Sequence, residues 1–275
     1  MHFLEALERE LDFQKEYEKL ERMIVLEEHY DGSGFYGSSI NNWIEKHFRE
    51  WKERGNYTSF NEIREWLGFT VDKYNDDLFL SAHVDMGKYF TFCEMIITIT
   101  SALGYKNDIH FQKPINAVID TMLANINKAG FELKIHNKEF IVVEKNPVAS
   151  EVAEIVPNLA DVIIEYNRYL LRGNLKRKKE ILKRISDALE PRRNYLKQIC
   201  KREESDYFFL VNNMDVRHNN CDPSDSNNYR ASFALLNDKE KELWYDTIYE
   251  QALTLFVLEQ QDKRSKKIKE YKDNQ

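Results

Sequence analysis

Glycine, proline and cysteine are all scarce in this chain of 275 residues. Its 9 glycines and 5 prolines argue against a loop-rich sandwich or a glycine-rich nucleotide-binding fold. Its three cysteines lie far apart and form no Cys-x-x-Cys pair, so neither a disulfide framework nor a thiolate zinc site is indicated. No window approaches 18 uninterrupted apolar residues, and the N-terminus is too charged for a signal peptide. We therefore expect a cytoplasmic protein without a membrane partner.

Charge is spread unevenly along a composition that is otherwise typical of a globular protein. Hydrophobic residues make up 42% of the chain and charged residues 32%, which argues against disorder. The net charge of −7 hides a basic stretch at residues 172–202, with 12 Lys/Arg against 3 Asp/Glu. Such a stretch indicates either a surface facing a polyanion or only a solvated helix face, and both interpretations stay open. The candidate RNA-binding residues are Lys176, Arg177, Lys179, Lys183, Arg192 and Arg193.

Helical spacing of apolar residues organises most of residues 1–148. The predicted helices are 3–30, 40–54, 59–67, 90–103 and 114–130. The glycine cluster at 31–38 lacks the Lys-Ser/Thr ending of a phosphate-binding loop and is predicted to be a turn. His83 and Asp85 have no third ligand in view, so no metal site is predicted.

Alternation replaces helical spacing at residues 131–144. Phe131, Leu133 and Ile135 alternate with polar residues, and a short His-Asn-Lys segment follows them, so a β-hairpin is predicted. A helix followed by a hairpin occurs in winged-helix DNA-binding modules, but this one carries few basic residues. We therefore favour a two-stranded flap over the core.

From Pro147 onward the pattern is helical throughout. The predicted helices are 159–172, 175–190, 207–218 and 238–264. Short connections between them are typical of an up-and-down bundle. The predicted fold class is therefore mainly α, with a C-terminal helical bundle over 149–275. An N-terminal, mostly helical region with one β-hairpin occupies 1–148.

The stretch NNMDVRHNN, residues 212–220, concentrates hydrogen-bonding side chains after an apolar run. If the helix continues to His218, Phe209, Asn213 and Arg217 share one face. The amides and Arg217 then either tie the bundle together or form an anion site. Metal-independent RNA cleavage needs a base, commonly His, and a cation at the phosphate, commonly Arg. Because adjacent helix residues point about 100° apart, such a site would be shared between two subunits.

An Arg-polar motif in a late helix of a bundle resembles the HEPN superfamily of small helical domains. Arg217 matches the motif's arginine and His218 its polar second position. The motif's closing histidine falls at 222–224, where this chain has Asp, Pro and Ser. The elements VRHNN and WYDTIYEQAL also resemble the C-terminal region of bacterial abortive-infection proteins. The resemblance covers about residues 155–265.

This resemblance implies a phage-defence or toxin–antitoxin protein that binds or cleaves RNA as a homodimer, without a cofactor. Arg217 would hold phosphate and His218 would transfer the proton. Asn213 and Asn220 would orient both side chains. Supporting or structural roles would fall to Asn212, Asn219, Asp246 and Tyr249.

A second hypothesis keeps the bundle but removes the chemistry. In it, the chain is a non-catalytic interaction or regulatory module of a defence complex, and its partner is another protein. Arg217 is then a structural brace, and Asp246 is its candidate ion-pair partner. The two hypotheses differ in where the Arg217 side chain lies.

Overall fold

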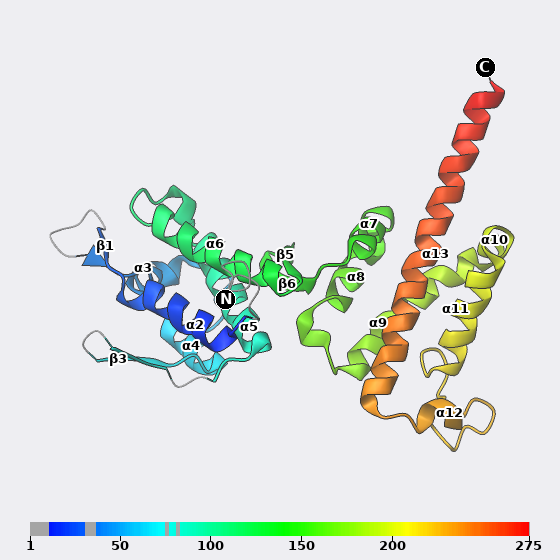
Figure 1. The fold of residues 1–275 in the computed structure, drawn as a ribbon, viewed down its shortest axis with the longest axis horizontal. Helices are drawn as coiled ribbons and strands as arrows, with labels where there is room; N and C mark the ends of the chain where they lie inside the picture. Colours follow the sequence, from blue (N-terminus) through cyan, green and yellow to red (C-terminus); the bar gives the residue numbers. More distant parts are fainter. Residues whose placement is uncertain (1–10, 31–36, 75–76, 81–82, 275) are drawn as a thin grey trace, which may run out of the picture. The chain divides into compact units, whose positions relative to one another are not determined.

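The computed structural model describes residues 11–30, 37–74, 77–80 and 83–274. The chain is mainly helical, as predicted, and its strands occur in two-stranded antiparallel sheets (Figure 1). It divides into two compact units, residues 1–142 and residues 143–275, called here the N-terminal and C-terminal units. Among the described residues, no helix is both long and apolar enough to cross a membrane.

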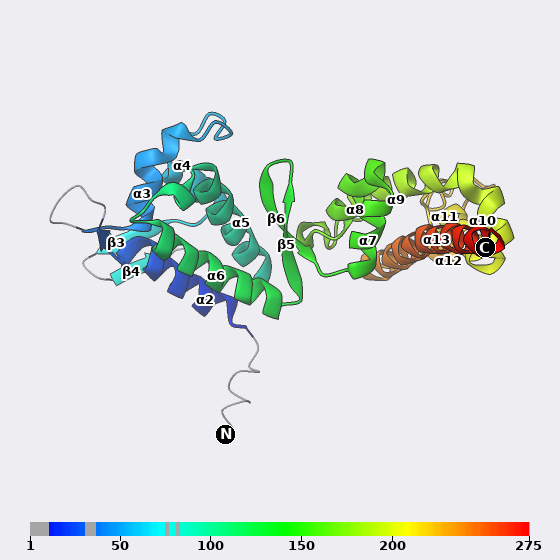
Figure 2. The same cartoon turned by 90° about the horizontal axis from the view of Figure 1, so that it is seen from above.

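The N-terminal unit is built around one thoroughly buried helix. Its helices are α2 (Phe13–Glu21) with a π-helical turn (Arg22–Leu26), α3 (Ile40–His47) with a 3-10 turn (Phe48–Glu50), α4 (Phe60–Leu67), α5 (Met86–Ala102), a 3-10 turn (Tyr105–Asn107) and α6 (Gln112–Lys128). Helix α5 packs against α2 and α6 (Figure 2). Consecutive residues of α5, such as Phe92-Cys93 and Ile96-Ile97, are buried, as expected for a helix that is packed on all sides.

Short hairpins complete the N-terminal unit. The strands are β1 (His29–Tyr30) with β2 (Gly37–Ser38), β3 (Val71–Tyr74) with β4 (Asp77–Leu80), and β5 (Phe131–His136) with β6 (Glu139–Glu144). The hairpin predicted at 131–144 is confirmed. Asn137 and Lys138 adopt φ values of 48° and 69°, the left-handed pair required by a type I′ turn.

The helix predicted over 3–30 is wrong at its C-terminal end. Residues 3–10 lie outside the described part of the chain, and helical geometry in the rest ends at Leu26. Glu27 is already extended, and the two residues that follow Glu28 pair as β1 with β2. Strand β1 pairs with Gly37 and Ser38. The spacing of apolar residues along a helix carries no information about such a contact.

A buried ion pair joins α2 to α4. Arg64 Nη2 lies 2.5 Å from Glu21 Oε1, and the side chains are 3% and 0% exposed. Arg64 Nε also donates to Phe69 O at 3.2 Å. Burial raises the pKa of the Glu21 carboxyl above its usual value, and the charge of Arg64 opposes this rise. Each charged group therefore depends on the other to remain in the core.

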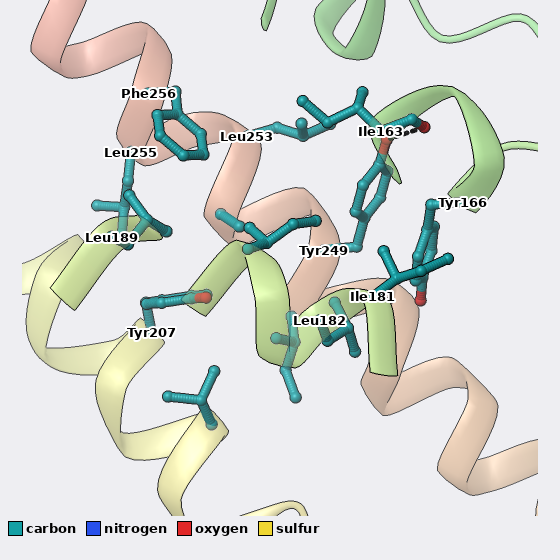
Figure 3. Close-up of a cluster of buried hydrophobic side chains, with 14 of the residues drawn as sticks. Ile163, Tyr166, Ile181, Leu182, Leu189, Tyr207, Tyr249, Leu253, Leu255 and Phe256 are labelled. Carbon is teal, nitrogen blue, oxygen red and sulfur yellow. Dashed lines mark hydrogen bonds between the residues drawn. The ribbon is translucent and has the colours of Figure 1, made fainter. Parts of the chain in front are cut away.

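The C-terminal unit is a bundle organised by one long helix. Its elements are α7 (Pro147–Ile155), a 3-10 turn (Pro157–Leu159), α8 (Ala160–Tyr166), a 3-10 turn (Tyr169–Leu171), α9 (Leu175–Leu189), a 3-10 turn (Glu190–Arg192), α10 (Arg193–Ile199), α11 (Lys201–Asn213), α12 (Ala231–Ala234) and α13 (Asp238–Asp273). Helix α13 packs against α7, α9, α10 and α11. Figure 3 shows Leu182 of α9, Tyr207 of α11 and Leu253 of α13 in their common core.

Two predicted helices of this unit have different limits. The helix predicted over 159–172 stops at Tyr166, because Asn167 O accepts a hydrogen bond from Glu144 N at 2.8 Å and Arg168 forms a β-bridge with Val143. Helix α13 continues to Asp273, beyond the predicted end near residue 264.

The first turns of α13 leave large apolar side chains exposed. Leu243 and Trp244 are 67% and 38% exposed, whereas the neighbouring Tyr245 is buried at 3%. Large apolar side chains near the start of α13 therefore face away from the core.

Candidate functional site

The segment around Arg217 is a folded loop and not a continuation of α11. Helix α11 ends at Asn213, and Asp215 adopts a φ of 60°. The chain then turns back, so that Arg217 N donates to Val211 O at 3.1 Å. The predicted helix to residue 218 is wrong, since the left-handed conformation at Asp215, which Asp and Asn tolerate, breaks it. Phe209, Asn213 and Arg217 therefore share no helical face.

Asn213 and Asn220 hold this loop together. Asn220 is fully buried, where its Oδ1 accepts from Asp215 N at 2.8 Å and its Nδ2 donates to Asn228 O at 2.6 Å. Asn213 donates to Phe209 O at 2.8 Å and accepts from Arg230 Nε at 2.8 Å. The two amides predicted to orient Arg217 and His218 thus make these side-chain bonds to the loop and to α11.

Arg217 belongs to a chain of alternating charges. Its Nη1 lies 2.5 Å from Glu190 Oε2. The other oxygen of Glu190 lies 3.7 Å from Arg193 Nη1, and Arg193 Nε lies 2.7 Å from the buried carboxylate of Glu204. The Arg193 guanidinium also covers the ring of Phe208 at 4.3 Å. The network connects the loop after α11 to the end of α9 and to the starts of α10 and α11.

His218 lies apart from this network. The side chains of His218 and Asn219 are exposed, whereas Asn212 in the last turn of α11 is half-buried. No hydrogen bond within the described part of the loop joins His218 to Arg217. Behind the loop, burial raises the pKa of Tyr207 well above its usual value, so this hydroxyl stays protonated and cannot act as a base at neutral pH.

Asp246 and Tyr249 belong to a different polar cluster, centred on Lys178. The Lys178 Nζ lies 2.6 Å from Asp246 Oδ1 and 2.8 Å from Glu242 Oε1, and its side chain is 6% exposed. Tyr166 donates to Asp246 at 2.9 Å, and its ring stacks on that of Tyr249 at 4.0 Å between centroids. The cluster borders a cavity of about 660 Å³.

The proposed Arg217–Asp246 pair is therefore wrong. Asp246 is engaged at Lys178 and Arg217 at Glu190. Lys178 of α9 and Glu190, directly after α9, are twelve positions apart, which corresponds to roughly 18 Å along a helix axis. Arg217 is nonetheless an internal ion-pair partner, with Glu190 in place of Asp246.

Most of the predicted RNA-binding cations are already paired within the unit. Arg177 lies 2.6 Å from Glu165, Lys179 lies 2.6 Å from Asp215, Arg192 lies 2.9 Å from Glu259, and Arg193 is held by Glu204 as above. Lys176 and Lys183 are exposed, and none of the described carboxylates lies within 4 Å of either. The same holds for Arg184, which the sequence analysis did not select.

Lys178 and Glu190 are the structurally important residues that the sequence analysis missed. Lys178 lies on the same helical stripe as Ile181, Leu182 and Ile185, so its spacing could have identified it as buried. Glu190 carries no comparable local signal, because its partners Arg193 and Arg217 come together only in the folded bundle.

Comparison with known proteins gives no further assignment. No protein-family model, no curated protein and no solved structure matches the chain. Among the described residues, no three His, Cys, Asp or Glu side chains are grouped to hold a metal ion. The relation to the HEPN superfamily stays a prediction from the motif.

Proposed function

We propose that the C-terminal unit is a HEPN-like module of a phage-defence or toxin–antitoxin system, acting in the cytoplasm by binding RNA without cleaving it. The observation that carries this proposal is the ion pair between Arg217 and Glu190, which argues against cleavage. A catalytic arginine must offer its donors to the phosphate as charge develops. In this loop a phosphate would have to displace a carboxylate that is itself fixed by Arg193.

The histidine that RNA cleavage would need is not positioned for that role either. His218 is exposed and lies outside the charge network, and no histidine follows at 222–224. A general base must be held within hydrogen-bond reach of the proton that it removes. One exposed imidazole without a described orienting partner does not meet this requirement, which favours binding over cleavage.

The RNA-binding part of the proposal rests on cations that the fold leaves unpaired. Lys176 and Lys183 project from the exposed face of α9 together with Arg184. Cations without carboxylate partners are those able to neutralise phosphates, and such contacts weaken as salt rises.

The cleavage question is decided with Arg217→Ala and His218→Ala. We expect that the wild-type protein leaves RNA intact in the presence of EDTA, and that neither substitution alters the RNA. The measurement is the length distribution of an end-labelled RNA after incubation with each protein. Cleavage by the wild type that is lost in both folded variants would establish Arg217 and His218 as catalytic.

The stability of the same variants provides the control. Arg217→Ala removes an ion pair in which both side chains are partly exposed, so we expect a loss of about 1 kcal/mol in unfolding free energy. His218→Ala should stay within about 0.5 kcal/mol of the wild type, since its side chain is exposed. Urea unfolding followed by circular dichroism measures both. Equal stability of the two variants would contradict the role of Arg217 as a brace.

A second candidate function is a module that binds a copy of itself or another defence protein. It is favoured by the exposure of Leu235 at 82%, Leu243 at 67% and Trp244 at 38%, since large exposed apolar side chains are typical of protein contacts. Homodimerisation is also what the HEPN resemblance implies.

If this unit binds a copy of itself, light scattering should give twice the monomer mass for the wild type and the monomer mass for Leu243→Lys. A wild type that is monomeric at micromolar concentration would argue against self-association.

A further inference from the structure

The end of α13 is the most exposed basic segment of the C-terminal unit. Every residue from 263 to 274 is exposed, and Figure 1 shows this end of the helix projecting beyond its neighbours in the unit. The side-chain contacts with α10 finish at Lys266, whose Nζ lies 3.1 Å from Tyr195 Oη. From Lys267 onward the helix has all of its faces in solvent.

Three of the six cations in this segment have no carboxylate partner among the described residues. Residues 263–273 contain six Lys/Arg and two Asp/Glu. Lys263, Arg264 and Lys266 pair with Glu259, Glu151 and Asp262, but their own side chains are 53%, 60% and 57% exposed. The pairs of Arg264 and Lys266 lie at the surface, and such pairs contribute little and exchange readily. Lys267, Lys269 and Lys272 have no carboxylate within 4 Å among the described residues, so their charge is free for a ligand.

An exposed aromatic ring lies among these cations. Tyr271 is 68% exposed and Ile268 is 56% exposed. Single-stranded nucleic acids are commonly bound by cations that follow the phosphates together with aromatic rings that stack on bases. The segment offers both groups within about two helical turns.

We infer that the end of α13, residues 263–273, contacts RNA, with its lysines on phosphates and Tyr271 stacked on a base. This inference rests on the RNA-binding function proposed above and names the surface that performs it. A protein partner fits less well, because a stable interface needs an apolar centre and only Ile268 and Tyr271 are apolar here. Lys267 and Lys269 also point about 200° apart around the helix axis. A flexible strand can reach both side chains, whereas a flat protein surface cannot.

The test compares three variants by fluorescence anisotropy with a labelled single-stranded RNA of about 20 nucleotides, at about 50 to 200 mM KCl. The first variant combines Lys267→Gln, Lys269→Gln and Lys272→Gln. Removing three phosphate contacts should make the slope of log K against log salt about 2 less steep. At about 100 mM salt, that slope corresponds to a loss of affinity of about 100-fold.

The second variant, Tyr271→Ala, separates stacking from charge. It should weaken binding about 5- to 150-fold, the range for one stacked base, with an unchanged salt slope. The third combines Lys52→Gln, Lys106→Gln and Lys113→Gln, exposed lysines of the N-terminal unit. This matched control removes the same charge elsewhere and should alter the slope by less than about 1. None of the substituted side chains is buried, so all three variants should fold, and circular dichroism checks this.

The outcomes distinguish the inference from the function beneath it. Absence of RNA binding by the wild type would overturn both. Binding by the wild type that is unchanged in the α13 variants would overturn only the inference, and Lys176, Lys183 and Arg184 would then be the remaining contacts. If the α13 variants differed from the wild type in the mass measured by light scattering but not in RNA affinity, this helix end would contact a second copy of the chain. That result would also overturn the inference.

Discussion

Replacing Arg64 with alanine should lower the free energy of unfolding of the N-terminal unit by about 3–5 kcal/mol. The substitution leaves the Glu21 carboxylate, 0% exposed, without the guanidinium 2.5 Å away. Removing one member of a buried ion pair is costly because the other charge stays desolvated. Urea unfolding of the full chain, followed by circular dichroism, measures the loss.

The pH dependence of this loss gives an independent readout. Without the charge and hydrogen bond of Arg64, burial is opposed only by Tyr17, so the pKa of the Glu21 carboxyl rises further than in the wild type. A folded carboxyl with a raised pKa is stable when protonated, and its contribution is lost as pH rises through that pKa. We therefore expect the deficit of Arg64→Ala to be smaller near pH 4.5 than at neutral pH. A deficit that does not change with pH would contradict this account.

The double variant Glu21→Leu/Arg64→Met is the matched control. It replaces both charges with apolar side chains of similar length, and such exchanges are commonly neutral or stabilising. We expect it to recover most of the stability that Arg64→Ala loses. A double variant as unstable as the single one would show that the packing of α2 against α4, and not the unpaired charge, sets the cost.

The second large effect is expected for Asn220→Ala in the C-terminal unit. The substitution removes the partners of Asp215 N and Asn228 O at a residue that is fully buried. Each buried backbone group left unsatisfied costs about 1–3 kcal/mol, so we expect a loss of about 2–4 kcal/mol. Hydrogen exchange of the amides between residues 214 and 230 should accelerate along with it.

Asn219→Ala provides the comparison for this prediction. Asn219 is the adjacent asparagine and is exposed, so its replacement should change the unfolding free energy by less than about 0.5 kcal/mol. If the two alanine variants proved equally stable, Asn220 could not be the residue that fastens the loop.

The sequence was most informative where structure is set by neighbouring residues. The 131–144 hairpin follows from alternation and from Asn137, a residue type that tolerates the left-handed conformation it adopts. Most helices follow from apolar spacing in the same way. The end of α11 at Asn213 could not be predicted, because it is fixed by contacts with residues such as Asn228 and Arg230, later in the chain.

The basic stretch at 172–202 shows the same limit for charge. Its local excess of Lys/Arg is clear, but several of the carboxylates that neutralise it come from distant positions. Arg192 pairs with Glu259 of α13, and Lys179 pairs with Asp215 of the loop. Charge counted along the chain therefore does not report which cations the fold leaves exposed.

The position of α13 has a consequence for synthesis of the protein. Helices α7, α9, α10 and α11 all pack on α13, which is made after them, so their apolar faces stay uncovered while the chain is still growing. Uncovered apolar surface on a nascent chain is what chaperones bind and what drives aggregation. Folding of this unit is therefore late in translation, and chains terminated before Tyr249, Leu253 and Phe256 are made would be substrates for degradation.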